Sequence, residues 1–276
     1  MIIVDRPDFN VADIIATFGE TMNENRIVHH AEDLEQAEAS FHLLADDERL
    51  YEFRSHNAAV EIPLRTAVKW AYKNRLLRGS ARGYYNRLRE ASRLGRCPLC
   101  LVREASELDH YLPKRKFPEL AIVPINLVPI CDECNGTKLE YAGENPGDQI
   151  LHGYYDDFAT RPWLTCIVDE SPGAPLHFSV VPETNWTAHQ AARVQFHFEK
   201  FGLDTLYADQ AAVELTGIRG YLVGLLDTGG PSEVSAYLAE MAQSLSAEPA
   251  LVWKEVAYRG WSESEWFCAG GVSAVA

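Results

Sequence analysis

The feature that most constrains this 276-residue chain is a set of four cysteines arranged as two Cys-x-x-Cys pairs. The first pair is Cys97 and Cys100, and the second is Cys131 and Cys134. In a reducing compartment such pairs are far more often zinc ligands than disulfides, because four thiolates supply the tetrahedral sulfur shell that structural zinc prefers. Thirty residues separate the two pairs. We therefore expect one structural zinc ion per chain and a folded segment between the pairs.

The composition, 47% hydrophobic and 24% charged, is ordinary for a soluble globular protein. The first residues, MIIVDRPDF, carry acidic charge and a proline where a secretory signal would need a basic start and a longer apolar run. No stretch approaches the roughly 18 apolar residues of a membrane span. These features predict a cytoplasmic protein with no membrane partner. The two remaining cysteines, Cys166 and Cys268, stand alone and are expected to be small buried apolar residues.

The charge of the chain is unevenly distributed. The net charge is −15, yet the segment from Arg65 to Lys116 holds fourteen Lys and Arg against four Asp and Glu. A basic block inside an acidic chain is expected where one surface meets phosphates. The alternative is a set of solvated helix faces. We favour the phosphate-binding interpretation because this basic block, residues 65–116, adjoins the cysteine pairs.

Hydrophobic periodicity divides the chain into three regions and predicts an α+β fold. Residues 1–60 are acidic and helical, with Asn10 as a helix cap. Residues 61–160 contain basic helices followed by the cysteine-framed segment. Residues 161–276 are mostly helical, after a short hairpin formed by WLTCIVD and LHFSVVP. Tyrosines such as Tyr72 alternate with the arginines of the basic helices, and we expect them to be core residues rather than base-stacking ones.

Polar residues suited to phosphodiester hydrolysis lie between and after the cysteine pairs: Asp109, His110, Asn126 and Asn135. The reaction needs a base for water, a cation for the developing charge and rigid placement of both. A neutral histidine suits the base, and Asp and Asn oxygens are hard ligands for Mg²⁺ or Mn²⁺. A zinc ion closed by four sulfurs could not take that role. Taken singly, each residue has a structural explanation: a surface pair, a turn or a helix cap.

The segments DHYLP, INLVP and CNGTK follow one another along the chain in the order found in the HNH, or ββα-metal, nuclease family. The chain resembles in particular the zinc-knuckle-framed subgroup of that family. The segments also resemble the HNH domain of RNA-guided CRISPR nucleases. The resemblance covers about 45 residues. It implies that His110 is the general base, that Asp109 and Asn135 bind a catalytic Mg²⁺ or Mn²⁺, and that Asn126 braces the loop bearing the histidine. Asn135 stands where many members have a histidine, which is expected to weaken metal affinity rather than change the reaction.

The resemblance implies a ββα-metal unit embedded between mostly helical regions, and an endonuclease that hydrolyses phosphodiester bonds, with DNA as the favoured substrate. Lys114, Arg115 and Lys116 are expected to contact backbone phosphates, and Lys138 is expected to contact the scissile phosphate. The chain also resembles HNH effectors of bacterial anti-phage systems, Septu-like or retron-linked, which implies an ATPase subunit as partner. The sequence leaves open whether the chain forms a homo-oligomer. The alternatives are an inactive zinc-stabilised nucleic-acid-binding module and an RNase.

Overall fold

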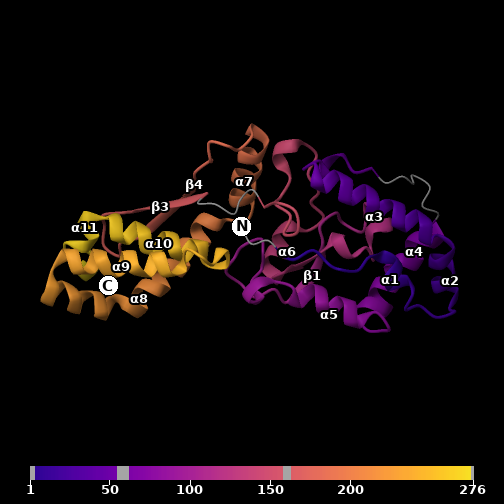
Figure 1. The fold of residues 1–276 in the computed structure, drawn as a ribbon, viewed down its shortest axis with the longest axis horizontal. Helices are drawn as coiled ribbons and strands as arrows, with labels where there is room; N and C mark the ends of the chain where they lie inside the picture. The colour runs from indigo at the N-terminus through magenta and orange to yellow at the C-terminus, as the bar shows by residue number, and fades with distance from the viewer. Residues whose placement is uncertain (1–3, 55–61, 158–162, 275–276) are drawn as a thin grey trace. The chain divides into compact units, whose positions relative to one another are not determined.

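The computed structural model describes residues 4–54, 62–157 and 163–274, which form two compact units divided after Asp157 (Figure 1). Helices are combined with two separate two-stranded antiparallel sheets, so the expected mixture of helices and strands is confirmed. The division expected between residues 160 and 161 lies close to the division between the units. No such division falls near residue 60, because the acidic N-terminal helices and the basic helices belong to the same unit.

The N-terminal half of the first unit is helical, and its first two helices begin at capping boxes. Asn10 accepts a hydrogen bond from the Asp13 backbone, and the Asp13 side chain accepts one in return, as expected for a capped helix start. Thr21 and Glu24 repeat this arrangement. The elements are α1 (Val11–Ile15), α2 (Met22–His29), α3 (Ala31–Asp46), η1 (Leu50–Glu52), α4 (Ile62–Ala71), the π-helical turn η2 (Tyr72–Leu76), α5 (Arg82–Glu90) and η3 (Arg93–Gly95).

The second half of this unit contains two short strands followed by a helix. β1 (Glu107–His110) pairs antiparallel with β2 (Leu127–Ile130), with His110 opposite Leu127. Between them lie η4 (Pro118–Leu120) and η5 (Pro124–Asn126). The helix α6 (Asp132–Lys138) follows β2 directly, and η6 (Pro146–Asp148) comes after it. Helix α5 packs against both strands, and α3 packs against η4 and η5. The hairpin and its long loop are therefore held inside the unit.

The second unit is a hairpin packed on helices, as expected from its sequence pattern. β3 (Leu164–Val168) pairs antiparallel with β4 (Leu176–Val180). β3 packs against α10 and β4 against α8, and the core includes the fully buried rings of Tyr207 and Trp261. The remaining elements are α7 (Ala188–Lys200), α8 (Leu203–Gly229), α9 (Pro231–Leu245), η8 (Pro249–Leu251), α10 (Val252–Glu263), α11 (Glu265–Cys268) and η9 (Gly271–Ala274). Among the described residues, no helix is long and apolar enough to cross a membrane.

Candidate functional site

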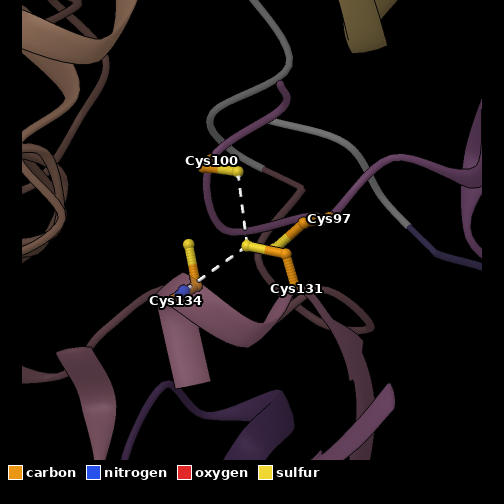
Figure 2. Close-up of side chains that lie close together, drawn as sticks. All are labelled: Cys97, Cys100, Cys131 and Cys134. Atoms are coloured by element: carbon orange, nitrogen blue, oxygen red, sulfur yellow. Dashed lines mark hydrogen bonds between the residues drawn. The ribbon is translucent and has the colours of Figure 1, made fainter. Parts of the chain in front are cut away.

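The four paired cysteines converge in one buried cluster, as the sequence predicts. Cys97 and Cys100 come from the loop before β1, and Cys131 and Cys134 come from the start of α6 (Figure 2). Their ligand atoms all lie within 4.8 Å of one another. Cys131 is also the N-cap of α6, because its Sγ accepts a hydrogen bond from the Cys134 backbone N–H at 3.4 Å. The knuckle geometry thus fixes the beginning of the helix.

The dimensions of this cluster suit a tetrahedral metal ion rather than disulfides. The Cys100 and Cys131 sulfurs are 4.0 Å apart, about twice the sulfur–sulfur bond length of roughly 2.05 Å. Four Zn–S bonds of about 2.3 Å would place the sulfurs about 3.8 Å apart. Burial raises the pKa of the Cys97 thiol, so a divalent cation would be needed to hold all four groups as thiolates. The four cysteines could therefore hold a metal such as zinc. Outside the cluster, Cys166 and Cys268 are buried, as expected.

His110 ends β1 and is 2% exposed. Its Nε2 donates a hydrogen bond to the Ala121 carbonyl at 2.9 Å, which leaves Nδ1 as an acceptor. The Lys114 ammonium lies 3.4 Å from Nδ1, and the Tyr72 ring packs against the imidazole with centroids 4.6 Å apart. Burial, together with the nearby Lys114 charge, lowers the pKa of His110 to about 3. The imidazole is therefore neutral at physiological pH, with its unprotonated nitrogen toward Lys114.

Asp109 is paired with a buried lysine from α6. The Lys138 ammonium lies 2.8 Å from the Asp109 carboxylate and donates to the His110 carbonyl, also at 2.8 Å. Lys138 is only 2% exposed. The sequence predicted that Lys138 contacts phosphate, but its buried ammonium binds the Asp109 carboxylate and the His110 carbonyl of β1 instead. We therefore revise its role to that of an ion-pair partner that joins α6 to the strand.

Asn135 projects from the same side of α6, one turn before Lys138. Its amide Nδ2 donates to the Glu107 carboxylate at 2.7 Å. Glu107 and Asp109 are two residues apart on β1 and so share one face of the strand. The structure thus brings Asn135 and Asp109 to one helix–strand contact, but each has a different partner. Glu107 is not among the site residues predicted from the sequence, although its spacing of two from Asp109 in a strand was a signal for it.

Asn126 is fully buried and fastens both ends of the loop between the strands. Its Oδ1 accepts from the Leu112 backbone N–H at 2.7 Å, and its Nδ2 donates to the Leu112 carbonyl at 3.0 Å and the Leu120 carbonyl at 3.2 Å. In addition, the Tyr111 N–H donates to the backbone carbonyl of Asn126 at 2.8 Å. The side chain therefore braces the segment that follows His110.

Asp109 and His110 line one surface pocket of about 240 Å³. Its other walls include the cations Lys69, Lys114 and Arg115 and the carboxylate Glu140. Asn135 is not among the described residues that line this pocket, so the pocket does not bring together all three residues expected to form the catalytic site. Arg115 is exposed and pairs with Glu140 at 3.2 Å. Lys116 is exposed and lines a neighbouring pocket.

Leu139 directly follows the last residue of α6 and lines the pocket. Its backbone has an unusual conformation. Leu139 is 70% exposed and has φ +51° and ψ −130°, a region that side-chain-bearing residues seldom adopt. Strained backbone of this kind clusters at functional sites. No sequence pattern marked Leu139, because an exposed leucine after a helix carries no signal of its own.

Among known proteins, the chain is similar to protein ea31 of Escherichia phage lambda. The two are 28% identical over 207 residues, which cover 70% of this chain and 69% of that protein. No protein-family model matches the chain, and no solved structure matches it.

Proposed function

We propose that this protein is a metal-dependent endonuclease of the HNH type, acting on DNA. The observation that carries the proposal is the order of the elements around Asp109 and His110. A strand ending in this pair, a long braced loop, a returning strand and a short helix follow one another. One cysteine pair precedes the first strand, and the other lies at the start of the helix. This is the order that a ββα-metal unit with a zinc-knuckle frame requires.

The tautomer of His110 supports a role as general base, and its burial, which lowers its pKa to about 3, must be relieved before the imidazole can accept a proton at neutral pH. The hydrogen bond to Ala121 fixes the tautomer, so the proton stays on Nε2 and the lone pair on Nδ1. Tyr72 restricts the ring from one side. A base must reach the proton that it removes, so the Lys114 ammonium, 3.4 Å from Nδ1, has to move aside when water and substrate enter. A released Lys114 would then be free to face a substrate phosphate.

The chemistry of the residues beside His110 suits a catalytic Mg²⁺ or Mn²⁺. Asp109 is a hard oxygen donor, and its carboxylate already faces a cation, the Lys138 ammonium at 2.8 Å. Asp109 would hold the metal, and Asn135 would add an amide oxygen after its amide group is oriented by Glu107. Such an ion, when bound, polarises the phosphoryl group and stabilises its developing charge. Lys138 would keep contact with the His110 carbonyl.

The charge around the pocket supports an anionic polymer as substrate. Lys69, Lys114 and Arg115 line the pocket, and all three belong to the basic block that the sequence placed beside the cysteines. Phosphate contacts of this kind give affinity without sequence preference. DNA is the substrate we propose, and RNA is the competing substrate that the experiment must include.

The test is cleavage by the purified full-length chain of supercoiled plasmid, linear duplex, single-stranded DNA and RNA, with Mg²⁺, Mn²⁺ or EDTA. Loss of a general base typically lowers a rate by about 10²–10⁴-fold. His110→Ala should therefore lose cleavage while keeping zinc content and DNA affinity. His177→Ala is the matched control, because His177 is exposed in the second unit. Wild-type cleavage by His110→Ala would exclude the proposal, and DNA binding without any cleavage would leave the inactive binding module as the function.

A further inference from the structure

A second pocket, of about 360 Å³, lies beside the one that holds His110. Its volume falls in the range of roughly 300–1,000 Å³ that is usual for small-ligand sites. Its lining includes Tyr51, Arg54, Leu112, Lys116, Phe117 and Glu144. Of these residues, only Lys116 has a role predicted from the sequence.

Two short segments form a wall between the pockets. In the loop after β1, Pro113, Lys114 and Arg115 line the His110 pocket, whereas Leu112, Lys116 and Phe117 line the second one. The segment after α6 is divided in the same way, because residues 139–140 line the first pocket and residues 142–144 line the second. The two pockets therefore share the same two segments in their walls, so that one nucleic-acid strand could contact both.

The lining of the second pocket combines aromatic rings with cations. Tyr51 and Phe117 are partly exposed rings, and Arg54 and Lys116 are exposed cations. One carboxylate, Glu144, is also present. Aromatic faces beside positive charges are the recognition chemistry of single-stranded nucleic acid, in which bases stack on rings and phosphates meet cations.

The walls of this pocket are held in place by buried hydrogen bonds. Asn126 fixes the backbone of Leu112 through both its N–H and its carbonyl. The Phe117 N–H donates to Pro113, and its ring packs edge-on against Phe53 with centroids 5.4 Å apart. Gln149 accepts from the Tyr51 N–H at 3.0 Å. A preformed pocket binds its ligand at a smaller entropic cost.

We propose that the second pocket binds one unpaired nucleotide of the DNA strand, adjacent to the phosphodiester presented to His110. The base lies against Phe117 and the flanking phosphate faces Lys116 and Arg54. This inference rests on the proposed nuclease function and adds a substrate class to it. A base held in a duplex is paired and stacked, so the pocket selects DNA with an unpaired nucleotide beside the cleaved bond.

The test uses a single-stranded oligothymidine whose cleavage sites are first mapped. One abasic residue is then placed at successive positions along the strand. Base–aromatic stacking contributes about 1–3 kcal/mol per base, so an abasic residue at the flanking position should slow cleavage of that bond by about 5- to 150-fold. Phe117→Leu keeps an apolar side chain but has no aromatic face. In this variant the abasic substitution should cost almost nothing further, because the ring that the base contacts is already absent.

Matched controls separate the pocket from general effects. Phe9→Ala removes a partly exposed ring of the same unit, and Lys73→Ala removes an exposed cation of the same basic block. Neither residue is among the described residues that line the two pockets. Phe9→Ala should keep the full abasic penalty. Lys116→Ala should raise KM more than Lys73→Ala does.

The outcomes distinguish this inference from the function on which it rests. If the wild type cleaves but the abasic penalty is the same in Phe117→Leu, the pocket assignment is wrong and the nuclease assignment stands. If no DNA is cleaved but binding of the oligonucleotide, followed by fluorescence anisotropy, shows the same dependence on Phe117, the pocket binds a nucleotide and the nuclease assignment is wrong. A dependence seen with oligouridine and not with oligothymidine would overturn the choice of DNA.

Discussion

At the residue scale, the partners of Asp109 and Asn135 come from the contact between α6 and β1. Asp109, His110 and Asn126 could be selected because their types and order suit phosphodiester chemistry. The ion pair between Lys138 and Asp109 and the hydrogen bond from Asn135 to Glu107 depend on how α6 packs on β1. That packing is set by the cysteine cluster, which fixes where the helix begins. A linear pattern contains the spacing of these residues but not the angle at which the helix meets the strand.

Leu139 offers a test of stored backbone strain at the rim of the pocket. Its φ of +51° is disfavoured for leucine but open to glycine. Backbone strain of this type costs roughly 1–3 kcal/mol, and the added flexibility of glycine in the unfolded chain offsets roughly 0.5–1 kcal/mol of the gain. Leu139→Gly should therefore raise the free energy of unfolding by about 1 kcal/mol, as measured by urea denaturation of the zinc-loaded protein.

Leu139→Ala is the control for this substitution. Alanine removes the same exposed side chain but keeps Cβ and with it the strain, so the free energy of unfolding should stay close to that of the wild type. Equal stabilities for the glycine and alanine variants would show that no strain is stored at this position.

At the element scale, most helices and the hairpin of the second unit follow from sequence patterns. Capping boxes mark the starts of α1 and α2, and alternation marks β3 and β4. The π-helical turn η2 could not be predicted, because its residues are ordinary helix formers. This turn lies where Tyr72 packs on His110 and where Arg75 pairs with the buried Glu24 at 2.5 Å. The change from α-helical to π-helical geometry therefore coincides with tertiary contacts and does not follow from the helix propensity of these residues.

The cysteine cluster is expected to stabilise the neighbouring strands β1 and β2 and the start of α6. Cys131→Ser removes one sulfur ligand and weakens the cap of α6. Because the binding energy of a structural metal is also folding energy, this variant should lose zinc and the folded state of the segment from Cys97 to Lys138. Elemental analysis measures the metal, and hydrogen exchange of the β1 and β2 amides measures the folding. Cys268→Ser, a buried thiol that donates to Trp261 in the second unit, should keep one zinc per chain. Unchanged zinc content in Cys131→Ser would contradict the assignment.

The contact between α1 and α3 contains a buried carboxylate that makes stability depend on pH. Burial raises the pKa of Glu38 to about 7, from an ordinary value of 4.5. Between these two pH values the folded state binds more protons than the unfolded state, so this group's contribution to stability falls as pH rises and is lost above pH 7. Glu38→Gln keeps an oxygen for the Val11 N–H, which donates at 3.0 Å. The variant should therefore be more stable than the wild type at pH 8, by up to about 3 kcal/mol, and the difference should shrink toward pH 5.

The measurement compares urea denaturation of both proteins at each pH, so that any effect of pH on zinc binding enters both alike. Glu32→Gln, an exposed residue of the same helix, is the control and should show a small difference that does not change over this range. A Glu38→Gln difference that stays constant from pH 5 to pH 8 would show that Glu38 ionises normally in the folded protein.

At the scale of the whole molecule, charge and packing divide the chain in different ways. The basic block lies entirely in the first unit, together with acidic helices from before residue 60. The change from acidic to basic residues near residue 60 suggested a domain boundary at that position. Helix α2, from before residue 60, nevertheless packs on α4, which follows it. A change of surface charge does not require a new core, since charged side chains remain outside. The second unit has fourteen acidic and six basic residues, so the basic block remains the one region of net positive charge expected to draw DNA.

This distribution predicts how DNA affinity responds to salt. Each phosphate contact contributes about 0.9 to the slope of log affinity against log salt on duplex DNA and about 0.7 on a single strand. Replacing both Arg115 and Lys116 with glutamine should therefore lower the slope by up to about 1.8 on duplex DNA. The reduction should be smaller if the Glu140 carboxylate, 3.2 Å from Arg115, keeps that arginine from phosphate.

Glutamine at Lys200 and Arg219 removes the same charge from the second unit and should leave the slope unchanged. Anisotropy titrations of a labelled duplex across a salt series measure both slopes, and equal losses in the two double variants would show that net charge, rather than this surface, governs binding.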